Sequence, residues 1–575
     1  MPDQMYDVVI VGGSLGGVAA ALRAGSSGAS VCLLESTGWL GGQYSAQGVT
    51  RPDENRFIET VGSTASYRAF RHNVRAFYRK NYRLSAAGAA QPTLDPGGAY
   101  PGFSTEPRVA HNVLLQELQA MPSVRVRLGN TVTGAQVQGN VVQNVRATDE
   151  SGAQTNYVAK YFLDATDLGE LLPMTGAEHS LGAESKDETG EPLAPPQAQP
   201  GWIQPITMVV ALERRPAGEN HVIDKPAEYD QLKQEQKYGL VDGYISTMFV
   251  PGKDLWGYRR YIDAANFDDP TFPNDLSMLN MGFNDYQQAT IPSGSPQQDA
   301  AIIARARQAS LGYVYWLQTE CPRDDGGGNG YPELMVRADQ FKTSDGTSAQ
   351  PYIRESRRIK AQYTIVQQDL DKSYWSGPRA KNYYDSCGIG LYGGLDIHGL
   401  AGAQMPQAFI NIAPFEIPLR SLIPVRVSNV LPACKNIGST HITNGAYRLH
   451  PVEWNVGEAA GALAAFALAN DILPSKVAND AALLRKYQRN LLHAGVPLYW
   501  WTDIAFGDPA FESAQLCGVA GIMSGEGTDM NFHPQDDFGA SARTAVEANL
   551  GRSMNWPAGF MTRAQAAAWI MSQLG

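Results

Sequence analysis

The first 35 residues combine two short apolar runs with a glycine-rich turn between them. Val8–Val11 is a run of four apolar residues, which predicts a buried strand. The glycines at positions 12, 13, 16 and 17 predict a tight turn, and the small residues of 18–24 predict a helix. A second apolar run, Val31–Leu34, predicts another buried strand and ends at Glu35. The pattern therefore predicts a βαβ unit at the start of the chain.

This unit carries the residues of a dinucleotide site. Gly12 permits the sharp turn from strand to helix, and Gly17 lets the helix pack closely on the sheet. Ser14 stands where the middle glycine of the usual motif lies, and serine is small enough for close backbone approach. The N-terminus of the helix offers N–H groups and a positive dipole end to a pyrophosphate, and Glu35 can accept hydrogen bonds from a ribose. We expect the dinucleotide to be bound by Gly12, Gly13, Ser14, Leu15, Gly16, Gly17 and Glu35.

The pattern changes several times along the rest of the chain. Residues 66–83 and 107–121 have apolar positions at helical spacing, and we interpret the arginines of the first helix as a solvated face. Residues 124–164 alternate with a period of two between turn signals, which predicts a β meander. Residues 456–469 form a small-residue helix suited to close packing. We expect four parts: 1–175 and 406–470 in a first domain, 176–405 in a mixed domain with a linker at 188–200, and a helical subdomain at 471–575.

Composition narrows the classes of function. The net charge of −11 argues against nucleic acid or an anionic membrane as the main partner. The five cysteines are scattered without a CxxC pair, so neither a disulfide framework nor a metal site is expected. No secretory signal precedes the first strand, and no apolar run is long enough to span a bilayer. We expect a cytoplasmic protein that acts on a small molecule and can form a homo-oligomer.

Several separated motifs resemble one family. Together with the βαβ unit and the meander, they resemble the FAD-dependent oxidoreductases with a glutathione-reductase-like fold. The matching segments include LeuGlyGlyGln at 40–43, PheLeuAspAlaThrAsp at 162–167, ProTyrIleArgGluSerArgArgIle at 351–359, LysAsnIleGlySerThrHis at 435–441 and the segment 444–461. The resemblance implies an α/β protein with a Rossmann-like FAD-binding domain, a mixed α+β substrate domain and a small helical C-terminal subdomain. It also implies FAD, which we expect to be bound non-covalently.

The resemblance implies further cofactor contacts. The turn at 165–167 would pass beside the adenine end, although AspAlaThrAsp departs here from the usual AlaThrGly. Segment 435–438 would approach the flavin chain, and the helix after Pro451 would point its N-terminus at the flavin ring, where a helix dipole stabilises negative charge. The implied cofactor-binding residues are Ser36, Gly42, Gln43, Val132, Ala165, Thr166, Asn436, Asn455 and Val456.

The same segments supply candidates for catalysis. Hydride transfer to flavin usually needs a base for the substrate proton, and a histidine can take it near neutral pH. Structural hydrogen bonds are the alternative role for each histidine, and Glu355 is an alternative partner for Arg354. The catalytic candidates are His398, His441 and His450 as bases, with Tyr392, Tyr447 and Glu453 to orient or donate; Arg354 and Arg448 can bind a substrate carboxylate.

Three functions remain open at this point. The favoured one is an FAD-dependent dehydrogenase or oxidase that moves a hydride from a small organic substrate to flavin N5. The second is an FAD-dependent monooxygenase or reductase that uses NAD(P)H, although no second glycine-rich nucleotide motif is evident. The third is a glycan- or wall-binding protein with a vestigial flavin domain, because 502–535 and 561–570 resemble a surface-layer-homology repeat. For this C-terminal part we favour a role in packing or oligomerisation.

Overall fold

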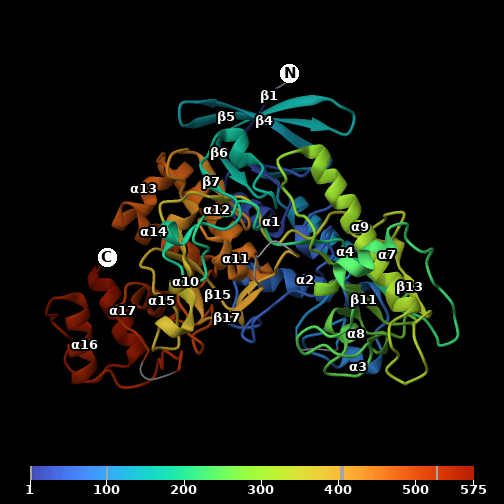
Figure 1. Ribbon diagram of the computed structural model, residues 1–575. Helices are drawn as coiled ribbons and strands as arrows, with labels where there is room; N and C mark the ends of the chain where they lie inside the picture. Colours follow the sequence, from blue (N-terminus) through green and yellow to red (C-terminus); the bar gives the residue numbers. More distant parts are fainter. Residues whose placement is uncertain (1–2, 99–101, 402–406, 526–528, 575) are drawn as a thin grey trace.

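The computed structural model describes residues 3–98, 102–401, 407–525 and 529–574 (Figure 1). Within these residues, the largest sheet has seven strands in the order β3-β2-β1-β6-β5-β4, and β19 also pairs with β6. β1, β2, β3, β6 and β19 run parallel to one another where they pair, whereas β4 is antiparallel to β5 and β5 is antiparallel to β6. The strands are β1 (Asp3–Val11), β2 (Val31–Leu34), β3 (Val124–Arg127), β4 (Asn130–Gln138), β5 (Val141–Asp149), β6 (Gln154–Asp164) and β19 (Val430–Pro432).

The two halves of β6 pair with different neighbouring strands. Residues 154–158 pair with β5 of the meander, while Phe162–Asp164 pair with β19, far along the chain. The same end of β6 lies beside β1, where Val11 is opposite Asp164. The carboxyl ends of β1, β2, β6 and β19 therefore meet at one edge of the sheet, where ligands of open α/β sheets bind.

Two helices from opposite ends of the family-like region pack together on this sheet. α1 (Leu15–Ser26) contacts α12 (His450–Asn470) at glycines, which confirms the expected close packing. A Cβ on Gly457 would lie 1.9 Å from the carbonyl oxygen of Gly16, and one on Gly461 would lie 2.3 Å from that of Ala20. Larger residues would force the two helices apart, so the small-residue composition of α12 follows from its position.

The basic helix does not expose its arginines as expected. The helix is α2 (Ala65–Asn81), and it packs against α4 (Pro107–Gln119). Arg71 is fully buried and lies 2.9 Å from Glu54, and Arg75 donates two hydrogen bonds to Glu59. The interpretation of a solvated face was wrong for these two side chains, because carboxylates from 54–59 fold over the helix and neutralise them.

The middle of the chain forms a second, antiparallel sheet. Its strand order is β10-β11-β9-β13, and α7 (Tyr229–Gln236) and α9 (Pro296–Thr319) pack together beside it (Figure 1). Residues of the expected linker are not free, because Glu191 is 1% exposed and accepts hydrogen bonds from Gln367 and Thr440. Here β9 is Val210–Arg214, β10 is Arg260–Ile262, β11 is Leu276–Leu279 and β13 is Leu334–Val336.

Short elements complete this region and connect it to the first sheet. The short helices are α3 (Ala86–Ala89), α5 (Leu171–Thr175), α6 (Lys186–Thr189), α8 (Leu255–Tyr258), α10 (Gln367–Leu370) and α11 (His441–Tyr447). Paired short strands are β7 (His179–Ser180) with β14 (Arg358–Ile359), β8 (Ile206–Thr207) with β12 (Asp285–Tyr286), β15 (Ser386–Gly390) with β18 (Phe415–Pro418), and β16 (Gly394–Ile397) with β17 (Ala408–Asn411).

The C-terminal part is helical and packs onto the rest of the chain. It lies on the opposite side of the molecule from α7 and α9 in Figure 1. Trp500 is buried and donates its indole N–H to the carbonyl oxygens of Gly390 and Phe415, which ties the segment to β15 and β18. The helices are α13 (Pro474–Ala478), α14 (Ala481–His493), α15 (Phe511–Val519), α16 (Ala540–Leu550) and α17 (Arg563–Leu574).

None of the helices in the described parts of the chain combines enough length with enough apolar character to cross a bilayer.

Candidate functional site

A cavity of about 310 Å³ opens at the carboxyl edge of the large sheet, and we name it the cofactor cavity. Its wall begins at the turn from β1 into α1 and continues through the ends of β2 and β6. Eight of the predicted cofactor residues line it: Gly12, Gly13, Ser14, Glu35, Ser36, Gly42, Ala165 and Thr166. A smaller adjoining cavity of about 30 Å³ is lined by Val132 together with Gly12, Ser36 and Thr166.

The turn at the start of α1 has the geometry that the glycines require. Gly12 has a φ of +103°, and a Cβ there would lie 2.3 Å from the carbonyl oxygen of Ala165. Ser14 caps α1, and its hydroxyl accepts a hydrogen bond from the N–H of Gly17 at 3.2 Å. The serine at the middle-glycine position thus also stabilises the helix whose N-terminus faces the cavity.

Glu35 closes the cavity at the end of β2. Its carboxylate accepts hydrogen bonds from the backbone N–H groups of Gly13 and Thr37, both at 2.7 Å. Burial raises the pKa of Glu35, and these hydrogen bonds oppose the rise. The acid is therefore fixed in position between the turn and the following loop, where a ribose can reach it.

A charged cluster lies at the other end of the cofactor cavity. Asp167, which lines the cavity, pairs with the buried ammonium of Lys435 and accepts a hydrogen bond from Gln47 at 2.7 Å. Lys435 follows β19 and also lies 3.9 Å from the carboxylate of Glu453. Asp167, which stands where the family usually has glycine, thus has an ion-pair partner, because the tertiary fold brings Lys435 beside it.

The other predicted cofactor residues lie beside this cavity rather than in its wall. Asn436 joins β19 to β6 through the carbonyl oxygen of Asp164, at 3.1 Å. Asn455 hydrogen-bonds the backbone of Cys387 and Ile389, away from the cavity. Gln43 donates hydrogen bonds to Glu453 and to the carbonyl oxygen of Arg448. The other four pack against backbone or core: Leu15, Gly16, Gly17 and Val456.

An extended segment separates the cofactor cavity from a second cavity of about 440 Å³, which we name the substrate cavity. Pro351 and Ile353 line the cofactor cavity, whereas Tyr352 and Arg354 line the substrate cavity. Alternate residues of extended chain point to opposite sides. One short segment therefore forms the shared wall of both cavities.

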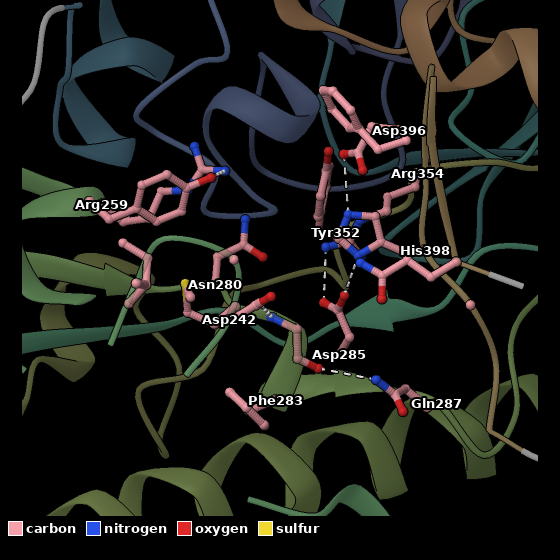
Figure 2. Close-up of a pocket in the computed structure, with 18 of the residues that line it drawn as sticks. Asp242, Arg259, Asn280, Phe283, Asp285, Gln287, Tyr352, Arg354, Asp396 and His398 are labelled. Carbon is pink, nitrogen blue, oxygen red and sulfur yellow. Dashed lines mark hydrogen bonds and ion pairs between the residues drawn. The ribbon is translucent and has the colours of Figure 1, made fainter. Parts of the chain in front are cut away.

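Five side chains in the wall of the substrate cavity form a continuous chain, of which Figure 2 labels Arg354, Asp285, His398 and Asp396. Arg354 donates to Asp285 at 2.9 Å, and Asp285 contacts Nδ1 of His398 at 2.8 Å. Nε2 of His398 lies 3.3 Å from Asp396, which in turn accepts from Arg448 at 2.8 Å. Three of the predicted residues, His398, Arg354 and Arg448, are thus brought together by two aspartates.

Each member of this chain is positioned by a different element. Asp285 begins β12 directly opposite Thr207 of β8, whose hydroxyl donates to it. Asp396 belongs to β16, which lies against α11, and Arg448 ends α11. Tyr392, another predicted residue, also lines the cavity. The cluster is therefore assembled from segments that are up to about 160 residues apart.

The two carboxylates control the charge of His398. Burial and the charge of Arg354 act to lower the pKa of His398, but the hydrogen bonds with Asp285 and Asp396 outweigh them, so the pKa is raised. The pKa of Asp396 is held low: burial raises it, and His398 and Arg448 more than offset that effect. The imidazole can therefore hold a proton close to neutral pH.

This raised pKa predicts a pH-dependent stability. A raised folded-state pKa means that the contribution of His398 is fully present below about pH 6.5 and is lost as the pH rises through the folded value. His398→Asn is expected to lower the free energy of unfolding by roughly 1–3 kcal/mol at about pH 5.5 and by less at about pH 8.5. Denaturant unfolding of both proteins at the two pH values measures the difference, and an equal loss at both would contradict the prediction.

The remaining catalytic candidates are buried elsewhere. His441 contacts Glu355 at 2.8 Å, and Tyr447 donates its hydroxyl to the carbonyl oxygen of Glu416. Nε2 of His450 contacts the carbonyl oxygen of Val49, and burial lowers the pKa of His450 to about 3. Glu453 accepts a hydrogen bond from the N–H of Gly16, and burial raises its pKa. None of these four lines the substrate cavity.

Comparison with known proteins now decides the family. The family model described as FAD dependent oxidoreductase matches residues 7–491. The chain belongs to the FAD dependent oxidoreductase family. It is therefore an enzyme of this class and uses FAD. Residues of α15 to α17 lie outside the matched range.

Solved structures show weaker likeness to this FAD dependent oxidoreductase. L-proline dehydrogenase from P.horikoshii is 16% identical over 33% of this chain and 26% of its own, with a TM-score of 0.17. The OxyS anhydrotetracycline hydroxylase from Streptomyces rimosus is 11% identical over 90% of this chain and 68% of its own, with a TM-score of 0.33. A geranylgeranyl bacteriochlorophyll reductase-like protein from Thermoplasma acidophilum is 9% identical over 90% and 87%, with a TM-score of 0.31. These likenesses are too weak to assign a reaction, and the curated proteins include no match.

The residues of the cofactor cavity fit FAD. The turn at Gly12 and Gly13 leaves no room for side chains, because a Cβ on Gly13 would lie 2.8 Å from Leu40. The N-terminus of α1 suits the pyrophosphate, and Glu35 suits the adenosine ribose. When bound, FAD supplies an acceptor for a hydride. The described residues hold no group of three or more metal ligands.

Sequence reasoning missed several residues of the substrate cavity, among them Asp285, Asp396, Arg259 and Tyr352. Asp396 was available as a signal, since it stands two residues before His398 within the family-like AspIleHis segment. Asp285 and Arg259 carry no such signal, because they reach the cavity only through the antiparallel part of the fold. The alternative pairing of Glu355 with Arg354 was wrong, because Glu355 pairs with Arg358 and His441 and Arg354 pairs with Asp285.

Proposed function

We propose that this enzyme is a dehydrogenase or oxidase that removes a hydride from a small organic molecule bound in the substrate cavity. The observation that carries the proposal is the Arg354–Asp285–His398–Asp396–Arg448 chain in the wall of the substrate cavity, with Arg354 on the segment that separates it from the cofactor cavity. Oxidation of an alcohol or amine carbon releases a hydride from carbon and a proton from oxygen or nitrogen. The site therefore needs a proton acceptor.

His398 is the proposed proton acceptor. Its Nε2 contact with Asp396 is the longer of the two, at 3.3 Å, so this is the contact that a substrate O–H or N–H replaces. Asp285, held by Arg354 and Thr207, keeps Nδ1 in place and stabilises the imidazolium that forms. Tyr392 and Tyr352 line the same cavity and orient the bound molecule.

Further proposals concern architecture. We propose that residues 1–175 and 406–470 form one FAD-binding domain of the glutathione-reductase type; support comes from the pairing of β19 with β6 and the meander of β4 to β6. Residues 176–405 would form the substrate domain. For the C-terminal residues 471–575 we propose a packing role, supported by the buried Trp500 and its bonds to β15 and β18, rather than binding of a wall polymer.

A visible absorption spectrum tests the function first. The purified protein is expected to show a flavin spectrum, and denaturation with acid is expected to release FAD, since no covalent link is proposed. Under anaerobic conditions, small alcohols, amines and their acids are then added in turn, and the flavin band is followed. Bleaching by one of them, followed by recovery on admitting air or another acceptor, supports the proposal.

Two other outcomes would contradict the proposed function. Bleaching by NADH or NADPH alone would contradict the proposal and indicate a monooxygenase or reductase. Absence of any flavin band would exclude both and favour a binding protein. His398→Asn provides the matched variant: it is expected to keep FAD and to slow anaerobic bleaching by roughly 10²-fold or more, the usual contribution of a general base.

A further inference from the structure

Three arginines line the substrate cavity, and all are at least nine-tenths buried: Arg259, Arg354 and Arg448 are 8%, 4% and 2% exposed. In each of them the buried Nε has no hydrogen-bond acceptor among the described residues. Such a concentration of cationic donors is unusual in a protein with a net charge of −11. Buried charges are normally paired, and each of these arginines has an aspartate partner: Asp53, Asp285 and Asp396 in that order.

The three arginines have different partners. Arg354 donates to Asp285, Thr207 and the carbonyl oxygen of Pro205, so it is held within the protein and positions Asp285. Arg259 and Arg448 each divide their donors between an aspartate and a phenol hydroxyl, and a ligand carboxylate, as the stronger acceptor, can replace the phenol. Arg259 donates to the hydroxyl of Tyr258 at 3.2 Å, and its nearest carboxylate is Asp53 at 3.3 Å. Arg448 donates to the hydroxyl of Tyr352 at 2.9 Å.

The charges of the lining residues agree with this difference. Among the described lining residues, four cationic side chains face four carboxylates: Lys237, Arg259, Arg354 and Arg448 against Asp53, Asp242, Asp285 and Asp396. With His398 neutral, as a proton acceptor must be, these charges balance, and the imidazolium that forms on proton transfer adds one positive charge. A ligand with one negative charge would balance it.

A second unpaired group lies in the same cavity. Asn280 is 5% exposed, and its side-chain oxygen has no donor among the described residues. An amide oxygen can accept a hydrogen bond from a hydroxyl or amino group. Figure 2 shows Arg259 and His398 on opposite sides of the cavity, with Asn280 and Tyr352 between them.

We propose that the substrate is a small organic acid with a hydroxyl or amino group, and that Arg259 and Arg448 bind its carboxylate while its reacting carbon points toward His398. This inference rests on the proposed function for the direction of the substrate. Arg259 thereby becomes the residue that selects acids, and Arg354 is a positioning residue. Guanidinium groups suit this task because their planar donors match a carboxylate.

Equilibrium binding to the FAD-loaded protein, with the flavin first reduced chemically so that it cannot accept a hydride, tests the inference without turnover. Isothermal calorimetry under anaerobic conditions compares each acid with its uncharged or cationic amide: lactate with lactamide, mandelate with mandelamide, and alanine with alaninamide. In at least one pair the acid is expected to bind roughly tenfold or more tightly than the amide, as charge-assisted hydrogen bonds require. If no acid in the three pairs binds more tightly than its amide, the inference is wrong.

Variants then locate the carboxylate. Arg259→Gln and Arg448→Gln are each expected to weaken binding of the acid by roughly 10- to 100-fold and to leave the amide unchanged. Lys225→Gln is the matched control, because Lys225 is exposed, pairs with Asp230 and lies outside the lining of the substrate cavity, so this variant is expected to change neither affinity. Equal losses for acid and amide, or an effect of Lys225→Gln as large as that of Arg259→Gln, would overturn the assignment.

Folding and function are controlled separately. Arg259→Lys keeps the charge and is expected to retain part of the preference for the acid, while FAD content and the unfolding transition show whether each variant is folded. Calorimetry needs no reaction, so a protein that prefers acids but is bleached only by NADPH would contradict the proposed function and leave the inference intact. A protein that oxidises a neutral alcohol and binds acid and amide equally would support the proposed function and contradict the inference.

Discussion

Gly12→Ala is expected to yield a protein that retains less than a tenth of the FAD found in the unsubstituted enzyme. At a φ of +103°, alanine costs about 1–2 kcal/mol in backbone energy. Its Cβ would also lie 2.3 Å from the carbonyl oxygen and 2.6 Å from the amide nitrogen of the Ala165–Thr166 peptide, and relieving that overlap costs about 1–3 kcal/mol more. Both strands that meet here, β1 and β6, support the wall of the cofactor cavity, so the displacement reaches the binding site directly.

The chain provides a matched control for this substitution. Gly28 has a similar φ of +94°, but no atom lies within 4 Å of the position that its Cβ would take. Gly28→Ala therefore incurs the backbone cost alone and is expected to retain FAD fully. The ratio of flavin absorbance to protein, together with the unfolding transition of each variant, measures the effect. Equal FAD content in the two variants would show that the contact with Ala165 does not matter.

Arg358→Met is expected to produce the largest loss of stability, about 3–5 kcal/mol, because it leaves buried carboxylates without a counter-charge. The guanidinium of Arg358 is fully buried. It lies 2.5 Å from Glu355 and 2.9 Å from Glu184, and it also donates to the carbonyl oxygens of Ser356 and Ser439. Burial raises the pKa of Glu184, and the charge of Arg358 more than offsets it, so the pKa of Glu184 is lowered.

An exposed ion pair and a compensating variant make this prediction specific. Arg426 pairs with Glu178 at 2.5 Å, but both side chains are about two-fifths exposed, so Arg426→Met is expected to cost less than about 1 kcal/mol. Adding Glu184→Gln and Glu355→Gln to Arg358→Met is expected to restore part of the loss, because the uncompensated charges disappear. Urea unfolding followed by near-ultraviolet circular dichroism measures all three. No recovery in the triple variant would show that lost packing, rather than charge, is responsible.

The cluster around Arg358 also explains why one catalytic hypothesis does not fit the structure. His441 was chosen as a base from its family-like segment, but its Nδ1 contacts Glu355, and it lies in the wall of neither the substrate nor the cofactor cavity. His398 has the same kind of carboxylate partners, yet it lines the substrate cavity. Both histidines sit in motifs of similar quality, so sequence could name the candidates and could not separate them. Exposure to a cavity depends on packing from distant segments.

Local patterns determined a great deal by themselves. The glycines of 12–17 and the apolar runs on either side specify the βαβ unit, because turn conformation and strand burial depend on neighbours in sequence. The small residues of α12 likewise indicated close packing before its partner was known. Helical and alternating periodicities located α2, α4 and the meander of β4 to β6 for the same local reason. The predicted start of the meander at 124 was wrong, because Val124–Arg127 instead pairs parallel with β2.

Tertiary structure decided which charged side chains line the substrate cavity, where we propose that the substrate binds. Asp285 comes from β12, Asp396 from β16 and Arg448 from the end of α11, and no spacing in the chain brings them together. Electrostatic pairing acts over a few ångströms in space and is independent of separation in sequence, so the partners of His398 and the choice between Arg259 and Arg354 appear only in the folded chain. The sequence by itself therefore indicated the family and the residues that fit FAD, and the fold decided which charged side chains line the substrate cavity.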